Sequence, residues 1–345
     1  MNKIILGLLG VFCSFTLAAR QSSQQPPTSG PKLYFTDNEY VSVTPPAGPD
    51  IAGTLKMNTF LTADFIYWTV RQDGMFHAVS GVGAGVPKGK VHDLDWEWDP
   101  GVKVGLGFNL PHDGWDIYAE YTWIKSSASD TTSAANLISY WSINAVPVIA
   151  ISESTASWNL TFNDIQLELA RNSYLSQYLK LRIHVGLEGT WIDQKYNVEQ
   201  TLGLDSSVDR LSLKQDFWGV GLRAGMNTSW QFTYEWSFFG DFALAILWGQ
   251  FDLDRTDSNT LVGGVRTINI NTGVKPYTFE PTLAITAGFR WETWFYENRY
   301  HVLFQAGWEH QLWILQNEYI KVPTETDHIG DLVLQGLTIR GRFDF

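Results

Sequence analysis

Residues 101–125 read GVKVGLGFNLPHDGWDIYAEYTWIK, and both halves of this segment alternate between apolar and polar or small residues. In 101–110 every even position is apolar, while the odd positions hold glycine, lysine and asparagine. After PHDG, the odd positions of 115–123 are the apolar ones. Because the side chains of a β-strand point alternately to opposite faces, this period predicts two amphipathic strands. The short polar connection predicts that they form an antiparallel hairpin.

The same alternation recurs along most of the chain from residue 55 onward. The apolar positions change parity within 157–170, which we interpret as a β-bulge. The strand count rises from ten to twelve or fourteen if the stretches 137–151 and 261–271 form additional pairs. The ten expected strands are 55–70, 101–110, 115–125, 157–170, 178–193, 216–228, 236–249, 277–291, 300–314 and 332–345.

The connections alternate between tight turns, such as PHDG (111–114), and long polar segments. This is the meander of an outer-membrane barrel, with periplasmic turns and extracellular loops. We therefore expect an all-β fold, a transmembrane antiparallel up-and-down β-barrel with ten strands. The long segments, expected to be loops, are 71–98, 126–156, 194–215, 250–275 and 317–331.

A soluble sandwich or barrel also alternates, so the two faces decide between the alternatives. The apolar faces carry large residues and many begin or end in an aromatic residue, whereas the opposite faces carry glycine and charged groups. The chain has 16 Trp among 345 residues, more than a water-soluble core easily buries. A lipid-facing surface explains both observations, and we predict a location in the bacterial outer membrane.

The N-terminal residues predict export. Residues 1–19 contain a basic residue, an apolar run and two final alanines, which is the layout of a cleaved signal peptide. Residues 20–54 are rich in Gln, Ser, Pro and Gly, which predicts a flexible periplasmic arm. The barrel is expected to occupy 55–345. The only cysteine, Cys13, lies in the leader, so the mature chain contains none.

The C-terminal residues predict assembly into the outer membrane. Phe343 and Phe345 share the parity of the apolar face, and Phe345 is the last residue. A terminal aromatic residue that ends an alternating strand is similar to the C-terminal signal of bacterial outer-membrane proteins. We therefore assign Phe343 and Phe345 to an assembly signal that the outer-membrane assembly machinery reads.

Two stretches resemble a known family. Residues 96–125, WEWDPGVKVGLGFNLPHDGWDIYAEYTWIK, resemble the first hairpin of the Legionella-type pore-forming outer-membrane proteins. Residues 163–198 resemble the central hairpin, above all at Arg182, Gly186-Leu187 and 191–194. The family includes proteins described as like the major outer membrane protein of environmental chlamydiae. The resemblance implies a barrel that forms a pore and carries over no catalytic residue.

Alternation also predicts which charged residues face the lumen. Seven of them are basic and five are acidic, which predicts a weak preference for anions although the chain has a net charge of −12. The predicted pore-lining residues are Lys103, Asp116, Glu120, Lys180, Arg182, His184, Glu188, Arg223, Glu280, Arg290, Glu292, Arg340 and Arg342.

Glycines on the predicted lumen faces bear on the width of the pore. Eight strands are filled by side chains whereas sixteen leave an aqueous channel, so ten strands lie near the lower limit. We expect the glycine-rich faces 101–107 and 219–225 to leave room for water. Gly105→Arg is accordingly expected to fold nearly normally and to obstruct the lumen.

The residue pattern does not predict a catalytic or metal site. His184 lies between Arg182 and Glu188 on the lumen face and needs a nucleophile beside it to act as a general base. The acidic run from Asp93 to Asp99 lacks the glycine turn and spacing of a calcium loop. We therefore expect no catalytic residue, no metal and no cofactor.

The function predicted from these patterns is an outer-membrane porin for passive diffusion of ions and small hydrophilic solutes. Two alternatives stay open: a hydrolase with an active site at the barrel rim, and a structural or adhesive barrel whose loops bind a host. The expected partners are outer-membrane lipid and lipopolysaccharide, the assembly machinery and the solutes. The sequence leaves open whether the protein forms a homo-oligomer. The excess of acidic residues argues against a nucleic-acid partner.

Overall fold

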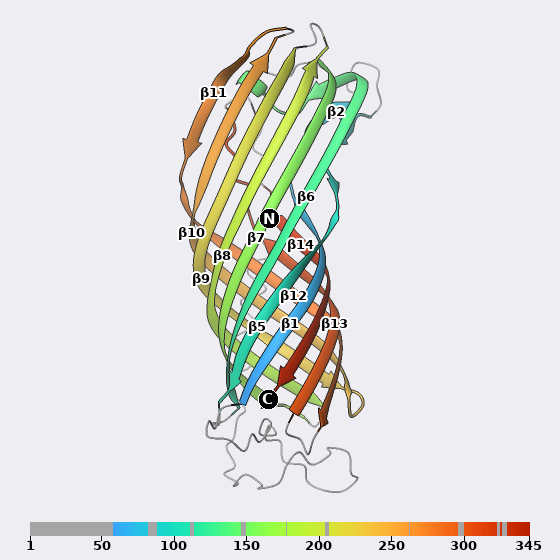
Figure 1. Cartoon of the computed structure of the whole chain (residues 1–345), viewed down its shortest axis with the longest axis vertical. Helices are drawn as coiled ribbons and strands as arrows, with labels where there is room; N and C mark the ends of the chain where they lie inside the picture. Colours follow the sequence, from blue (N-terminus) through green and yellow to red (C-terminus); the bar gives the residue numbers. More distant parts are fainter. Residues whose placement is uncertain are drawn as a thin grey trace. The chain divides into compact units, whose positions relative to one another are not determined.

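The computed structural model describes ten strands that close into an antiparallel barrel (Figure 1). No helix among its described residues is long and apolar enough to cross a membrane. The expected signal peptide, 1–19, and periplasmic arm, 20–54, lie outside the described residues. The described residues are 58–81, 88–110, 114–145, 150–176, 178–203, 207–261, 263–295, 300–322, 325 and 330–345.

Each strand of the ring pairs with its two neighbours, and β1 closes it by pairing with β14 from Phe60↔Asp344 to Gln72↔Leu332. In ring order the strands are β1 (Asn58–Gln72), β5 (Trp98–Asn109), β6 (Trp115–Ser139), β7 (Ala150–Tyr174), β8 (Leu179–Leu202), β9 (Val208–Gln231), β10 (Trp236–Thr260), β12 (Tyr277–Phe295), β13 (Tyr300–Trp313) and β14 (Leu332–Asp344). Short elements complete the chain: β2 (Ala78–Ser80), β3 (Lys90–His92), β4 (Asp95–Trp96), the 3-10 turn η2 (Ile143–Ala145) and β11 (Arg266–Val274).

The expected count of ten strands is confirmed, but three segments expected to be loops are mostly strand. Most of the described residues in 126–156, 194–215 and 250–275 belong to the strands β6–β11. In Figure 1 the strands β6–β10 run to the upper end, whereas β1, β5, β13 and β14 end lower. We call this upper extension, together with β2–β4, the crown. The described residues of 137–151 and 261–271 belong to it and add no pair to the ring, because among the described strands β11 pairs only with β10.

The outer wall below the crown is apolar, as alternation predicts. Its large outward side chains, such as Leu106, Val185 and Leu222, are exposed in the isolated chain. Aromatic rings gather at two levels, where they mark the two interfaces of the bilayer. The lower group contains Phe295, Tyr300, Phe343 and Phe345, and the upper group contains Tyr67, Trp98, Trp308, Trp218, Trp248 and Tyr277.

The change of parity in 157–170 is not a bulge. The register between β7 and β8 is unbroken from Glu153 to Tyr174. Trp158 and Phe162 point into the barrel and are fully buried, whereas Leu167 points outward and is exposed. The strand keeps its pleat while its apolar residues change from the inner face, in the crown, to the outer face, in the bilayer.

The glycine-rich lumen faces do not leave room for water. A Cβ on Gly105 would overlap the hydroxyls of Tyr118 and Thr62, and one on Gly107 would overlap the ring of Phe60. At Gly219 it would meet the Phe217 ring. The space beside Gly105 and Gly107 is taken by side chains from neighbouring strands, and that beside Gly219 by Phe217 of the same strand. The expectation that Gly105→Arg folds nearly normally is therefore wrong.

Two adjacent substitutions test the assignment of faces. Leu106→Arg places a cation on the lipid face, which costs about 2–4 kcal/mol of folding free energy near the midplane. Gly105→Ala overlaps Tyr118 and Thr62 and should cost about 1–3 kcal/mol through overpacking. Urea titration of refolded protein in lipid measures both losses. If Leu106→Arg leaves the midpoint unchanged, Leu106 does not face lipid.

The terminal phenylalanine provides a second test. Phe345 exchanges two backbone hydrogen bonds with Thr59, of 2.9 and 3.2 Å, and its ring stacks on Phe343. Deletion of Phe345 removes these contacts at the seam between the first and last strands. We expect the deleted chain to accumulate unfolded in the periplasm, as measured by fractionation and heat-modifiable mobility. Normal outer-membrane levels would contradict its role in assembly.

Candidate functional site

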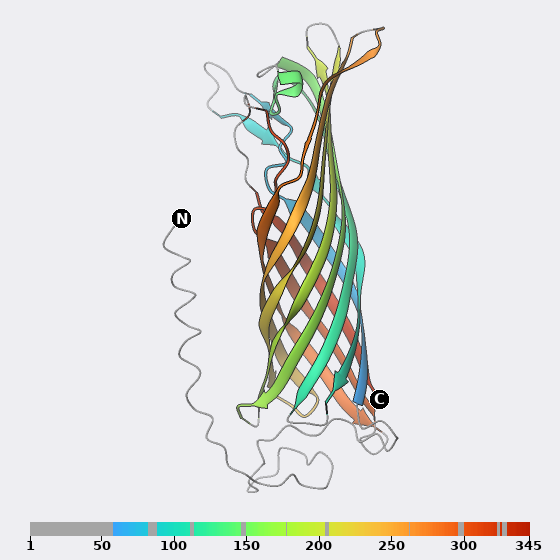
Figure 2. The ribbon, with the colours of Figure 1, turned by 90° about the vertical axis from the view of Figure 1, so that its left-hand side faces the viewer.

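The interior of the barrel is the candidate functional site, and it has two levels. At the level of the bilayer it contains charged and polar side chains. Above them, toward the crown, the inward residues are mostly apolar. Segments that are not part of the ring lie beside the extended strands at the upper end (Figure 2). Except for Glu280, the predicted pore-lining residues lie at the lower level, where the strands place them on the inner face. Their role in lining a conducting path stays a prediction.

One ion-pair network joins β1, β5, β6, β13 and β14. Lys103 donates a 2.6 Å hydrogen bond to Glu309 and lies 3.9 Å from Glu120. Arg340 pairs with Asp64 at 2.7 Å and also with Glu120. Lys103 is only 5% exposed, so its charge is compensated by carboxylates rather than by bulk water.

A second network joins β6, β7, β8 and β9. Arg182 contacts Asp116 at 2.6 Å and Glu168 at 2.8 Å, while Arg223 donates to Glu188 at 2.7 Å. The Nδ1 atom of His184 lies 3.3 Å from Glu168. The structure thus places His184 inside a network of ion pairs, which fits a structural role better than that of a general base.

The remaining predicted lining residues lie toward the two ends of this level. Arg290 bonds to Gln305, Arg342 pairs with Asp344, and Glu292 lies 3.6 Å from His301. Lys180 lies 6.0 Å from the centre of the Tyr174 ring. Glu280 is buried near the apolar level.

At least six inward carboxylates are absent from the predicted pore-lining set. They raise the acidic count of the lower level to at least ten against seven basic residues, so the expected preference for anions rested on an incomplete count. Strict parity would have found them, because each is adjacent to an outward apolar residue. The six are Asp64, Asp164, Glu168, Asp241, Glu309 and Asp344.

An apolar cluster fills the lumen above the charged networks. Aromatic rings from opposite walls meet, with 5.5 Å between the ring centres of Phe162 and Trp313. The rings of Phe217 and Phe251 are 4.7 Å apart. All four side chains are almost completely buried. The cluster therefore closes the described lumen to a continuous column of water.

An ionic hub lies inside the crown. Arg255 on β10 is fully buried and pairs with Asp257 at 2.9 Å and Glu325 at 2.7 Å. It also donates to the carbonyl oxygens of Ser142 and Ile320. Two chain segments from outside the ring, before η2 and after β13, are thereby attached to β10.

A second polar cluster in the crown was not predicted, because its members are far apart in the sequence. The two ring nitrogens of His77 each lie 2.9 Å from an oxygen, one of Ser154 and one of Asp130. This is the order of groups in a serine hydrolase. The Ser154 side chain is 0% exposed, however, so a substrate does not reach it. The cluster joins the β1–β2 connection to β6 and β7.

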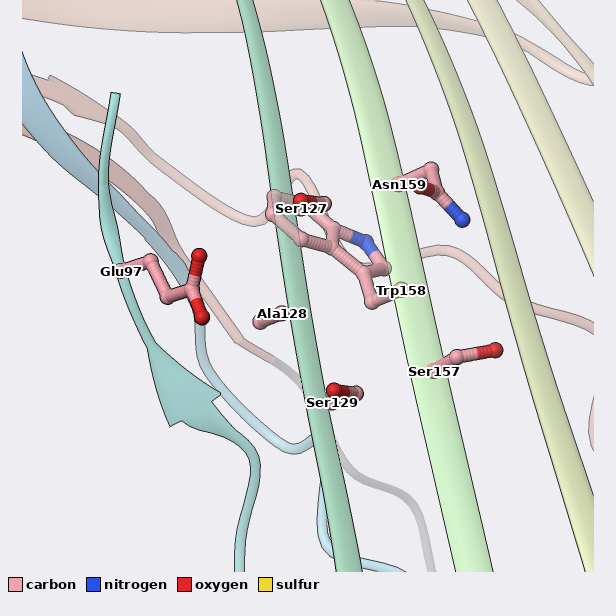
Figure 3. Close-up of a pocket in the computed structure, with 7 residues that line it drawn as sticks. All are labelled: Glu97, Ser127, Ala128, Ser129, Ser157, Trp158 and Asn159. Atoms are coloured by element: carbon pink, nitrogen blue, oxygen red, sulfur yellow. The ribbon is translucent and has the colours of Figure 1, made fainter.

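The surface pocket shown in Figure 3 lies where β6 and β7 meet the chain before β5. Glu97 supplies its single carboxylate, and Trp158 contributes from the wall. No histidine or second carboxylate lines it. Among the described residues no group of three His, Cys, Asp or Glu side chains is arranged to hold a metal ion.

The His77 cluster predicts that the crown loses stability in acid. Burial lowers the pKa of His77 below its ordinary 6.5, although Asp130 opposes this shift. The unfolded imidazole therefore takes up a proton first, and stability falls as pH drops below 6.5. Burial opposes ionisation of Asp130, but hydrogen bonds from Thr132 and His77 lower its pKa below 3.8, which adds a loss in stronger acid.

Amide hydrogen exchange, corrected for its intrinsic pH dependence, measures this effect in the crown residues of β6 and β7. We expect protection there to fall between neutral pH and pH 6 or below, while the bilayer-level strands stay protected. His77→Gln should make amide protection in the crown nearly independent of pH above the range in which Asp130 titrates. An equal loss of protection throughout the barrel would assign the effect to other groups.

Comparisons with solved structures find outer-membrane proteins at low identity. A major outer membrane protein from Thermus thermophilus is 12% identical over 84% of this chain and 99% of that chain, with a TM-score of 0.30. The outer membrane protease OmpT from Escherichia coli is 10% identical over 85% and 98%, with a TM-score of 0.37. The toluene transporter TodX from P. putida is 9% identical over 83% and 89%, with a TM-score of 0.32. No curated protein matches the chain.

A family model identifies the chain. Residues 54–345 match the model described as the Legionella pneumophila major outer membrane protein precursor. The match spans all ten strands of the ring, including the two hairpins whose sequences carry the resemblance. The chain therefore belongs to the family of the Legionella pneumophila major outer membrane protein.

Proposed function

We propose that this protein is a narrow outer-membrane channel for ions and small hydrophilic solutes, closed in the conformation described here. The observation that carries the proposal is the charged lumen at the level of the bilayer. A barrel that only needed to be stable could fill this space with apolar side chains, because buried ion pairs rarely stabilise more than well-packed apolar groups. Charged inner walls suit water and ions instead.

The charge of the lumen supports a preference for cations. At this level at least ten inward carboxylates stand against seven basic side chains. Fixed charges along the path set ion preference more directly than the net charge of the protein does. The narrow ring limits the solutes to small ones.

A second candidate function is a non-conducting structural barrel. The apolar cluster around Trp158, Phe162 and Trp313 favours it, because this cluster closes the lumen above the charged networks. Such a barrel would act through its wall or its crown, and bilayer recordings separate it from a channel. For both candidates, the apolar outer wall fits outer-membrane lipid and lipopolysaccharide. We also propose that the assembly machinery recognises Phe343 and Phe345 and that the barrel can form a homo-oligomer.

Planar-bilayer recording of refolded protein in a tenfold salt gradient tests the channel and its selectivity. We expect discrete conductance steps and a reversal potential on the cation side. Lys180→Gln removes an inward charge that forms no ion pair within 4 Å among the described residues, so it should move the reversal potential several millivolts further toward cations.

Lys195→Gln is the matched control, because Lys195 lies on the outer face of the crown. It should leave the reversal potential unchanged. Absence of conductance from folded protein over the accessible voltage range would favour the structural barrel. Equal shifts for both variants would show that Lys180 does not line the path.

A further inference from the structure

The connection from β13 to β14 does not leave the barrel directly. Ile314 still bonds to Pro281 on β12, and Leu315 then takes the left-handed conformation, with φ of 66°. This conformation is uncommon for a large side chain and turns the chain sharply. The following residues enter the lumen, where Gln316 is 0% exposed and Tyr319 is buried. We call residues 315–320 the strap.

The strap is attached to the wall across from its own strands. The Gln215 side chain on β9 donates a 2.6 Å hydrogen bond to the Gln316 carbonyl and accepts a 2.9 Å bond from the Glu318 amide. The Tyr319 hydroxyl donates to Gln194 on β8 at 3.3 Å. On the near side, Asn317 bonds to the Gly330 and Asp73 carbonyls. The strap therefore crosses the lumen at the level of the apolar cluster.

The strap also carries the ionic hub of the crown at its end. Arg255 donates to the Ile320 carbonyl at 3.1 Å and pairs with Glu325, whose carboxylate accepts the Val322 amide. The connection is thus fixed at Gln215 in its middle and at Arg255 beyond it. These contacts are polar and few in number, unlike the continuous ladders of the ring.

Burial of the strap leaves polar atoms without partners in the protein. The Gln316 side-chain amide, the Gln72 amide and one oxygen of Glu280 are buried and form no hydrogen bond within the described residues. Buried polar groups of this kind are costly, and native structures keep few of them. A conformation that admits water would satisfy them.

We propose that the strap is the gate of the channel. In the closed state it crosses the lumen and completes the apolar cluster. In the open state it leaves Gln215 and Gln194 and returns toward β13 and β14, and water enters the upper lumen. This inference rests on the proposed channel function and adds its regulation.

Gln215→Met tests the gate, because it removes both hydrogen bonds between the Gln215 side chain and the strap and changes the side-chain volume little. Loss of two hydrogen bonds should raise the ratio of open to closed time in bilayer recordings about tenfold. Gln200→Met is the matched control. Gln200 is an equally buried glutamine on β8, and its amide bonds to the His77 carbonyl at 3.3 Å rather than to the strap. It should leave gating unchanged.

Thiol labelling provides a readout that does not need conductance. The mature chain is expected to have no cysteine, so Gln316→Cys creates a single thiol that is buried in the closed state. A small membrane-impermeant thiol reagent should label it slowly, and several-fold faster when Gln215→Met is added. Heat-modifiable mobility confirms folding, and Tyr319→Phe, which removes the bond to Gln194, replaces Gln215→Met if that variant does not fold.

The outcomes separate the gate from the channel. The gate is supported if Gln215→Met gives more frequent opening and faster labelling and Gln200→Met gives neither. Conductance that Gln215→Met leaves unchanged, with Gln316→Cys unlabelled, overturns the gate and keeps the channel. Faster labelling in protein that never conducts shows a mobile strap and overturns the proposed channel, and the gate with it.

Discussion

Every backbone amide and carbonyl in a bilayer needs a partner within the protein, and this constraint decides the rest of the structure. A sheet satisfies it only by closing, and closure here depends on the pairing of β1 with β14 over thirteen residue pairs. In a closed ring of ten strands the interior is so narrow that inward side chains from different strands contact one another. Glycines then become the positions into which the rings of Phe60, Tyr118 and Phe217 fit.

The polarity of the wall inverts where the barrel leaves the bilayer. Below that level, Leu187, Val220 and Leu222 face lipid and the charged groups face inward. Above it, Ile192, Leu211 and Leu213 face inward and polar residues face water. The strands pass from one solvent to the other without a break in register, so only the parity of their apolar residues changes. The apolar cluster is the core of a water-exposed crown stacked on a membrane barrel.

This inversion explains how far the sequence predicts the fold. Alternation identified all ten strands and their lipid-facing residues, because lipid demands an uninterrupted apolar face. It failed at the upper ends, where outward residues become polar and a strand resembles a loop. Segments such as 194–215 were therefore expected to be loops, although their alternation continues with the opposite parity. Read in that way, the parity change within 157–170 marks the upper boundary of the bilayer.

Parity can also place a charge inside, but it cannot say whether the charge meets water or another side chain. The six missed carboxylates were available from the sequence. The ion pair of Lys103 with Glu309 joins residues 206 positions apart, and the bond of Gln215 to the Gln316 carbonyl depends on a chain that turns inward at Leu315. Such contacts follow from ring diameter and strand stagger, which no local pattern encodes.

The two levels of the interior oppose permeation by different physics. In the lower level, an ion entering the proposed channel would exchange its hydration for charges that already have partners. Its passage would depend on how readily side chains such as Arg182 and Lys103 exchange carboxylates. In the upper level, the apolar cluster excludes water itself, and no rearrangement of charges admits an ion. The strap belongs to this upper level but is held by polar contacts. It is the part of the closure whose release exchanges a few hydrogen bonds and the packing of the Tyr319 ring for hydration, without opening the ladders of the ring.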